Sequence, residues 1–287
     1  MFRNPSRGVV IATATTNPSR VTRSRLNRLI SAVNSLDGYH VEAALVVESD
    51  SKNTSGKQLF ESRKGRIRHA DLGDLRFKFP EREDRLAYAR NEYLGMFIND
   101  FSDAELLLVF DSDQGFFLRS GIKNAFDHID TYGAIFGSPF GLSYDAAALR
   151  VQGYIEDDYR NLDKLESPSF FLRICRYWLL VVVPLKRFRS DSKEQVQTVL
   201  SAFDGLALYQ RQCLINVQYS SKSAHSSIIC EHVGLHNSIV RNGNQLVRMR
   251  NFWFLSLNKH LLAQLTLGLV GPVVCRASKL KGYRRRT

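Results

Sequence analysis

The stretch LLLVFDSDQG, residues 106–115, joins five apolar residues to two aspartates that stand one residue apart. Such a run predicts a strand buried on both faces, as in a parallel sheet. In open α/β sheets ligands bind beyond the carboxyl ends of the strands, where Asp111 and Asp113 fall. Residues i and i+2 of an extended segment point to the same side. The two carboxylates therefore predict either a site for a hard divalent cation or a solvated acidic turn.

Strand and helix patterns alternate along the first half of the chain. Apolar, β-branched runs predict strands at residues 8–16, 40–50 and 132–140. Apolar residues at helical spacing predict helices at 20–36 and 82–100. This alternation predicts an α/β fold with a mainly parallel, Rossmann-like sheet flanked by helices.

The second half of the chain is less regular. Charged and apolar blocks between residues 153 and 197 predict a helical insertion. Residues 251–287 mix apolar runs with basic clusters and predict a basic, apolar C-terminal tail. We therefore expect one domain over residues 1–250 that contains the insertion, followed by the tail.

The charge of the chain favours acidic partners. It has 287 residues with 40 Lys+Arg against 28 Asp+Glu, a formal net charge of +12. Nucleic acid, an anionic membrane surface and phosphorylated substrates are all compatible with this charge. The four cysteines are scattered without a CxxC pair, which argues against a disulfide framework or a zinc site and favours a reducing compartment.

Two basic, apolar segments bear on membrane association. YWLLVVVPL (177–185) and LLAQLTLGLVGPVVC (261–275) are both shorter than the roughly 20 residues of a membrane span. Both are flanked by arginine and lysine, so they predict either interfacial binding to an anionic membrane or core segments with a solvated rim. The N-terminus lacks a signal-peptide pattern. We expect a cytoplasmic protein that is peripheral on the inner face of the membrane.

Six stretches in order along the chain carry a family resemblance. They are VVESDSKNTS (46–55), RLAYARNEYL (85–94), FDSDQG (110–115), YDAAALR (144–150), SAFDGLALYQ (201–210) and CEHVGLH (230–236). Together they resemble the GT-A-fold nucleotide-sugar glycosyltransferases of bacteria and fungi, particularly those akin to the cap-associated mannosyltransferases. The resemblance extends from about Val9 to Arg250 and implies a GT-A-like fold.

The resemblance implies that polar residues at the strand ends contact the nucleotide. Glu48 and Asp50 would border the nucleoside pocket, for which a capped surface loop is the alternative. Thr13 and Asn17 would contact the nucleoside, although such residues are equally suited to cap a helix. Asp111 would contact the ribose or the metal.

The resemblance also implies that a helix faces the phosphates. Arg85, Arg90 and Asn91 match an R-x-x-x-x-R-N motif. Arginine suits phosphate because it is always charged and offers forked donors. A solvated basic helix face is the competing interpretation.

The implied cofactor is Mn²⁺ or Mg²⁺. Asp111 and Asp113 would hold the ion, with Asp113 the firmer direct ligand. A further ligand would come from His232 or His236, each of which is equally typical of a core or surface histidine.

The implied chemistry needs a carboxylate near the sugar. Glu231 and Asp145 are the candidates, and Glu231 would be the general base if the reaction inverts the anomeric centre. Asp204 stands where the family pattern carries a glycine, so Asp204 and Gly205 would lie near the acceptor. Asp204 would either contact the acceptor or disturb its loop.

The resemblance thus implies a metal-dependent transfer of a sugar from a GDP- or UDP-sugar to a hydroxyl of a glycan or lipid-linked acceptor in surface polysaccharide synthesis. A nucleotidyltransferase is disfavoured because residues 12–20 lack a glycine-rich phosphate loop. An inactive GT-A-like scaffold and a basic nucleic-acid-binding protein are the two rival hypotheses. Buried strands that end in acidic pairs would repel nucleic acid, so no nucleic-acid partner is expected.

Overall fold

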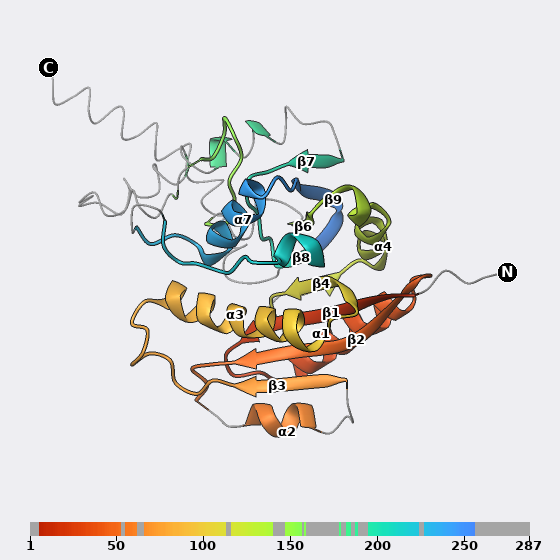
Figure 1. Ribbon diagram of the computed structural model, residues 1–287, viewed down its shortest axis with the longest axis vertical. Coiled ribbons are helices and arrows are strands. Elements are labelled where there is room, and N and C mark those ends of the chain that lie inside the picture. Colours follow the sequence, from red (N-terminus) through yellow and green to blue (C-terminus); the bar gives the residue numbers. More distant parts are fainter. Residues whose placement is uncertain are drawn as a thin grey trace, which may run out of the picture.

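The computed structural model describes residues 6–52, 55–61, 66–112, 116–139, 147–156, 195–223 and 227–255, with residues 158, 178, 182–184 and 187–188 described singly or in short runs. One mixed sheet of nine strands forms the centre of this part of the chain (Figure 1). Its order is β3-β2-β1-β4-β8-β6-β9-β5, and β7 pairs with β9 outside that path. The strands are β1 (Arg7–Thr15), β2 (Tyr39–Glu48), β3 (Ile67–Asp71), β4 (Ala104–Phe110), β5 (Phe116–Phe117), β6 (Ala134–Pro139), β7 (Val196–Thr198), β8 (Leu206–Gln210) and β9 (Leu246–Leu255).

The expected α/β class is confirmed, and the sheet divides into two halves. The strands β3, β2, β1 and β4 are mutually parallel, and Figure 1 shows them in succession across its lower half. The strand β8 runs antiparallel to both β4 and β6, whereas β9 is parallel to β6. The helices are α1 (Arg20–Asn34), α2 (Ser55–Glu61), α3 (Arg82–Asp100), α4 (Arg119–His128) and α7 (Glu231–Arg241), and the described 3₁₀ segments are η1 (Ile129–Thr131) and η4 (Arg211–Leu214).

Helices cover both faces of the sheet. Alternate residues of β1 point to opposite faces, so Val10 packs with α3 and α7 while Ile11 packs with α1 and α4. Ser19 caps α1 through a capping box with Thr22, which fixes where the chain turns from β1 into the helix. The central strands are buried on both faces, as their continuous apolar sequences predict.

Two predicted segments lie largely outside the described residues. Most of the predicted insertion at 153–197 belongs to them, as do residues 256–287 of the predicted tail. The strand β9 continues to Leu255, so the boundary predicted at residue 250 lies within a strand. Within the described residues, no helix combines the length and apolar character that a membrane crossing needs.

Candidate functional site

The connections of the sheet diverge at the carboxyl ends of β1 and β4. From β1 the chain passes through α1 to β2 and then to β3, whereas β4 lies on the other side of β1. A switch point of this kind leaves a crevice beyond the strand ends, which is where open α/β sheets bind ligands. Asp111 follows β4 directly at this edge. We therefore place the candidate site here.

Three hydrogen bonds hold Asp111 and Ser112 at the start of the acidic pair. The Asp111 N–H donates to the Gly205 carbonyl at 2.9 Å. The Ser112 hydroxyl donates to Thr15 Oγ1 at 2.8 Å, and the Ser112 carbonyl accepts from Arg25 Nη1 at 2.6 Å. Gly205 has φ +87°, a conformation that favours glycine. Gly205, which was expected near the acceptor, thus orients the residue that begins the acidic pair.

A buried arginine joins two carboxylates of the site. Arg90 on α3 is 5% exposed, and its Nη2 lies 3.2 Å from Asp111 Oδ1. Its Nε lies 3.0 Å from Glu231 Oε1 at the start of α7. Burial opposes the charge of Arg90, but nearby groups including Tyr93, Asp111 and Glu231 outweigh it and hold its pKa well above the usual value. Arg90 therefore bridges two carboxylates, and its predicted role toward the phosphates stays a prediction.

Glu231 and His232 belong to the same buried cluster as Arg90. The Glu231 residue is 4% exposed, and His232 Nε2 lies 3.9 Å from its Oε1. The His232 ring stacks on Phe203 with centroids 3.8 Å apart. Burial, followed by the charge of Arg90, lowers the pKa of His232 well below its usual value, so its ring is neutral. Neither ring nitrogen of His232 has a hydrogen-bond partner among the described residues.

His236 has both ring nitrogens in hydrogen bonds. Ser201 Oγ lies 2.8 Å from its Nδ1, and Tyr209 Oη lies 2.9 Å from its Nε2. Burial, followed by the charge of Arg90, lowers its pKa to about 3. Both nitrogens of His236 are thus engaged by the protein in this structure, and its predicted role as a metal ligand stays a prediction.

The structure describes only part of the predicted metal and catalytic set. Asp113 and Asp145 lie outside the described residues. Within the described ranges, no three or more His, Cys, Asp or Glu side chains are grouped so that they would hold a metal ion. The Asp111 side chain is 19% exposed at the sheet edge, so a carboxylate of the type that Mg²⁺ and Mn²⁺ prefer is present there.

Asp50 and Arg85 contact each other rather than standing free. Arg85 Nε donates to Asp50 Oδ2 at 2.9 Å, and Arg85 Nη1 donates to the carbonyls of Phe79 and Pro80. The other carboxylate oxygen of Asp50 accepts from the Leu75 N–H at 2.8 Å. The pair fixes the segment between β3 and α3 at the site edge, and part of each side chain remains exposed (17% for Asp50 and 18% for Arg85).

Two other residues expected to contact the nucleoside are buried. Glu48 is 2% exposed, and its Oε2 lies 2.7 Å from His69 Nε2. Thr13 is 0% exposed within β1. Both side chains are enclosed by the protein, and their predicted contacts with the nucleoside stay predictions.

Two asparagines connect backbone segments. Asn91 on α3 donates to the Tyr219 carbonyl at 3.0 Å and accepts from the Tyr219 N–H at 2.8 Å. Asn17 accepts from the Lys52 N–H at 2.8 Å and has φ +51°. Asn91 therefore attaches α3 to residues before α7, and Asn17 attaches the loop after β1 to the loop after β2. The whole amide of Asn91 and the amide oxygen of Asn17 are engaged by the backbone.

Asp204 forms a fully buried ion pair with Arg248. Both side chains are 0% exposed, and Arg248 Nη2 lies 2.9 Å from Asp204 Oδ2. Asp204 precedes β8 and Arg248 lies in β9, so the pair joins two segments on the α3 and α7 side of the sheet. The Asp204 carboxylate is therefore engaged by Arg248, and its predicted effect on the acceptor or its loop stays a prediction.

Sequence reasoning missed several residues that build the site. Arg25, Thr15 and Ser112 hold the first part of the acidic pair, yet each is a common residue in a polar context. Arg248 did carry a signal, because it is a charge inside the apolar strand sequence LVRM. Arg150 forms a buried ion pair with Asp158, in which Arg150 Nη2 lies 3.2 Å from Asp158 Oδ2.

Comparison with known proteins yields likenesses of fold at low sequence identity. No family model matches the chain, and no curated protein matches it. The mannosyltransferase PcManGT from Pyrobaculum calidifontis, solved with GDP-Man and Mn²⁺, is 13% identical with a TM-score of 0.48. The match covers 89% of this chain but only 58% of PcManGT, so the chain spans less than two thirds of that protein.

Two further solved structures are similar at the same level. A protein from Desulfovibrio desulfuricans G20, provisionally described as a nucleotide-diphospho-sugar transferase, is 7% identical with a TM-score of 0.38, over 87% of this chain and 81% of its own. A mycobacterial protein is 11% identical with a TM-score of 0.43, over 88% of this chain and 68% of its own. Likenesses of this degree concern the fold, so the functional argument rests on the geometry of the site.

Proposed function

We propose that the chain is a metal-dependent glycosyltransferase of GT-A-like fold. It would move a sugar from a nucleotide-diphosphosugar, with GDP or UDP as the nucleotide, to a hydroxyl of a glycan or lipid-linked acceptor. The main support is the position of Asp111, which follows β4 at the switch point and has its backbone held by Gly205. A buried strand that delivers a fixed, partly exposed carboxylate to this edge suits a cation and diphosphate site.

The proposed metal ligands are Asp111 and Asp113. Mn²⁺ or Mg²⁺ commonly binds through one or two carboxylates together with substrate phosphates, so a full cage of protein ligands is not required. Arg90 already lies 3.2 Å from Asp111 Oδ1, which favours Asp113 as the firmer ligand. Of the two histidines considered, His232 keeps ring nitrogens to which no described residue forms a hydrogen bond. The ion would stabilise the negative charge of the departing diphosphate.

The residues of the chain would orient the reacting groups. Arg90 holds Glu231 and Asp111 in a fixed relation across α3, α7 and the end of β4. Glu231 and Asp145 are the proposed carboxylates near the sugar, and one of them would accept the proton of the acceptor hydroxyl in an inverting reaction. The pair of Asp50 and Arg85 would border the nucleoside side, since part of each side chain remains exposed.

The proposed setting is the assembly of surface polysaccharide at the inner face of a membrane. The experiment is a panel of GDP- and UDP-sugars with Mn²⁺ or with EDTA, in which release of the nucleoside diphosphate is measured with and without candidate acceptors. We expect release from one donor class, dependent on the metal and lost in Asp113→Asn. Metal-dependent donor binding without turnover would support the inactive scaffold instead, and no response to any donor would contradict the proposal.

A further inference from the structure

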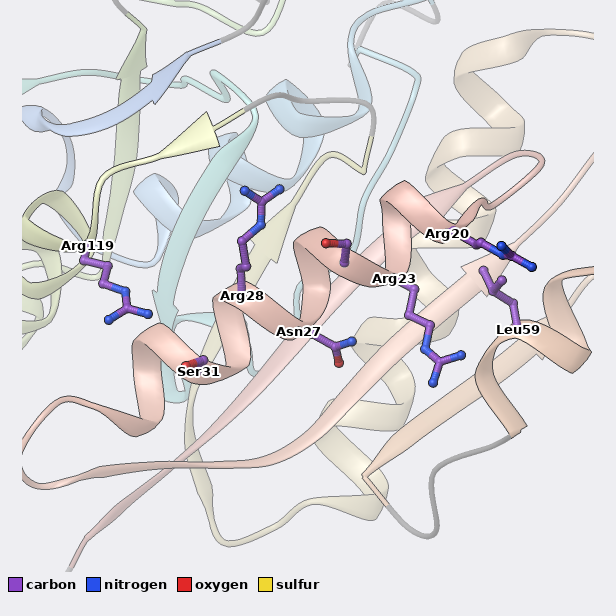
Figure 2. A pocket seen from close by; sticks show the side chains of 8 residues that line it. Arg20, Arg23, Asn27, Arg28, Ser31, Leu59 and Arg119 are labelled. Carbon is purple, nitrogen blue, oxygen red and sulfur yellow. The ribbon is translucent and has the colours of Figure 1, made fainter.

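A basic depression lies along the outer face of α1 (Figure 2). Its volume is about 430 Å³, and Figure 2 shows Arg23 and Arg28 pointing to opposite sides of the helix while Arg20 and Arg119 mark the two ends. The polar residues Ser24, Asn27 and Ser31 of α1 also line it. We call this surface, together with Leu59, the α1 groove.

The α1 groove occupies the face of the helix opposite to the core. The residues Leu26, Leu29 and Val33 of α1 are buried against the sheet. At about 100° per residue, the groove residues of α1 fall within an arc of roughly 140° centred on the opposite side. The buried side therefore holds α1 in place, and the groove is presented outward.

The charge of the α1 groove has one sign. Among the described residues, its lining contains four arginines and no aspartate or glutamate. The sequence of α1, RVTRSRLNRLISAVN, also contains no acidic residue, so this helix has no i,i+4 ion pair of its own. A surface that carries charges of one sign attracts ligands of the opposite sign, which here are anions. Arginine in particular binds phosphate through paired donors.

Exposed aliphatic side chains near the arginines favour an anionic lipid surface as the ligand of the groove. Val21 is 53% exposed, and Leu118, directly before Arg119, is 48% exposed. Val21 stands seven residues before Arg28, so the two lie about 20° apart around the helix axis. Arginine beside aliphatic side chains suits the interface of an anionic bilayer. Among the residues that the structure describes, the lining has no aromatic residue on which nucleic-acid bases would stack.

We propose that the α1 groove docks the protein on an anionic phospholipid surface. The four arginines would bind headgroup phosphates, and Val21 and Leu118 would enter the interfacial layer. This inference does not depend on the proposed transferase activity. Each basic residue near an anionic bilayer contributes roughly a fivefold gain in affinity, equivalent to about 1 kcal/mol.

The test is sedimentation of the full chain with phosphatidylcholine vesicles and with vesicles that also contain phosphatidylglycerol. We expect binding to the anionic vesicles and a roughly 100-fold loss in the triple variant Arg20→Gln, Arg28→Gln, Arg119→Gln, from three factors of about five. The matched control removes the same charge from exposed residues of other elements, Arg82→Gln, Lys222→Gln and Arg241→Gln. We expect the affinity of this control variant for anionic vesicles to fall by less than about threefold. Equal losses in the two triple variants, or none in either, would overturn the proposal.

A second comparison separates a membrane from other polyanions. The variant Val21→Ser with Leu118→Ser keeps every charge, and we expect it to lower vesicle affinity by roughly fivefold while binding of a short DNA duplex stays unchanged. Vesicle binding that is insensitive to this variant, or displaced by DNA at equal phosphate concentration, would assign the groove to a soluble polyanion instead. Thermal unfolding of each variant confirms that the changes leave the fold intact, since all these side chains are at the surface.

Discussion

Replacing Arg90 with methionine would test whether the buried arginine organises the site. The change keeps most of the side-chain volume but removes the charge that faces Glu231 at 3.0 Å and Asp111 at 3.2 Å. Removing one partner of a buried pair costs about 3–5 kcal/mol, because the remaining charge stays buried without compensation. The exposed side-chain fraction is 5% for Glu231 and 19% for Asp111, so Glu231 should account for most of this cost.

The assay is urea unfolding at neutral pH of Arg90→Met, Glu231→Gln and the double variant. We expect Arg90→Met to lower the free energy of unfolding by about 3–5 kcal/mol and the double variant to be less destabilised than the sum, with a coupling of about 1–3 kcal/mol. Arg82→Met at the exposed start of the same helix should change stability by less than about 0.5 kcal/mol. If the destabilisation of the double variant equals the sum of the two single variants within about 0.5 kcal/mol, Arg90 does not interact with Glu231 as proposed.

Three further predictions concern other parts of the same architecture. A Cβ at Gly234 of α7 would lie 2.1 Å from the Ser220 carbonyl oxygen, so Gly234→Ala should cost about 1–3 kcal/mol in thermal unfolding, whereas Gly95→Ala on α3, with no atom within 4 Å, should gain up to about 1 kcal/mol. This packing would be contradicted if Gly95→Ala lowered the stability of the protein while Gly234→Ala left it unchanged. The pKa of His236 is about 3 in the folded protein, against a usual value of 6.5. Between these two pH values the unfolded chain binds more protons than the folded protein, so the free energy of unfolding falls as the pH falls. The free energy of unfolding, measured in urea, should depend on pH between pH 6 and 5 by about 1 kcal/mol per pH unit less in His236→Asn than in the unchanged protein. An unchanged pH dependence in His236→Asn would show that His236 does not remain neutral. Asp204→Ala should cost about 3–5 kcal/mol because Arg248 stays buried, and Asp204→Leu with Arg248→Met should recover most of this loss, so a double variant as unstable as the single one would argue against the ion pair.

The fold was largely predictable because its strands are buried on both faces. The sequences of β1, β2 and β4 are continuous apolar runs, and the helix predicted at 82–100 has the bounds of α3. The predicted parallel order holds for the half of the sheet that contains these strands. The antiparallel position of β8 was not predictable, because its sequence LALYQ resembles that of any buried strand and its direction depends on a distant partner.

The roles of the polar residues were harder to predict than their positions. Arg90, Asn91 and Arg85 lie on α3 as expected, but each is engaged by other residues of the protein. The sequence pattern of a ligand-binding arginine and that of a buried bridging arginine are the same, because both need a forked cation next to apolar neighbours. The burial of Asp204 in an ion pair was easier to infer than the role of Arg90. A lone charge in an apolar segment needs a buried partner, which Arg248 supplies.

Calorimetric titration of GDP and UDP into the full chain, with Mn²⁺ and with EDTA, tests the central claim most directly. The decisive comparison sets Asp111→Asn, at the carboxyl end of β4, beside Asp103→Asn, an exposed residue just before the amino end of the same strand. The proposed site predicts that one nucleotide binds only with metal, that Asp111→Asn weakens it at least about tenfold, and that Asp103→Asn leaves it unchanged. Binding that is equally strong with EDTA, or equally affected by both variants, would contradict a metal and diphosphate site at this edge of the sheet.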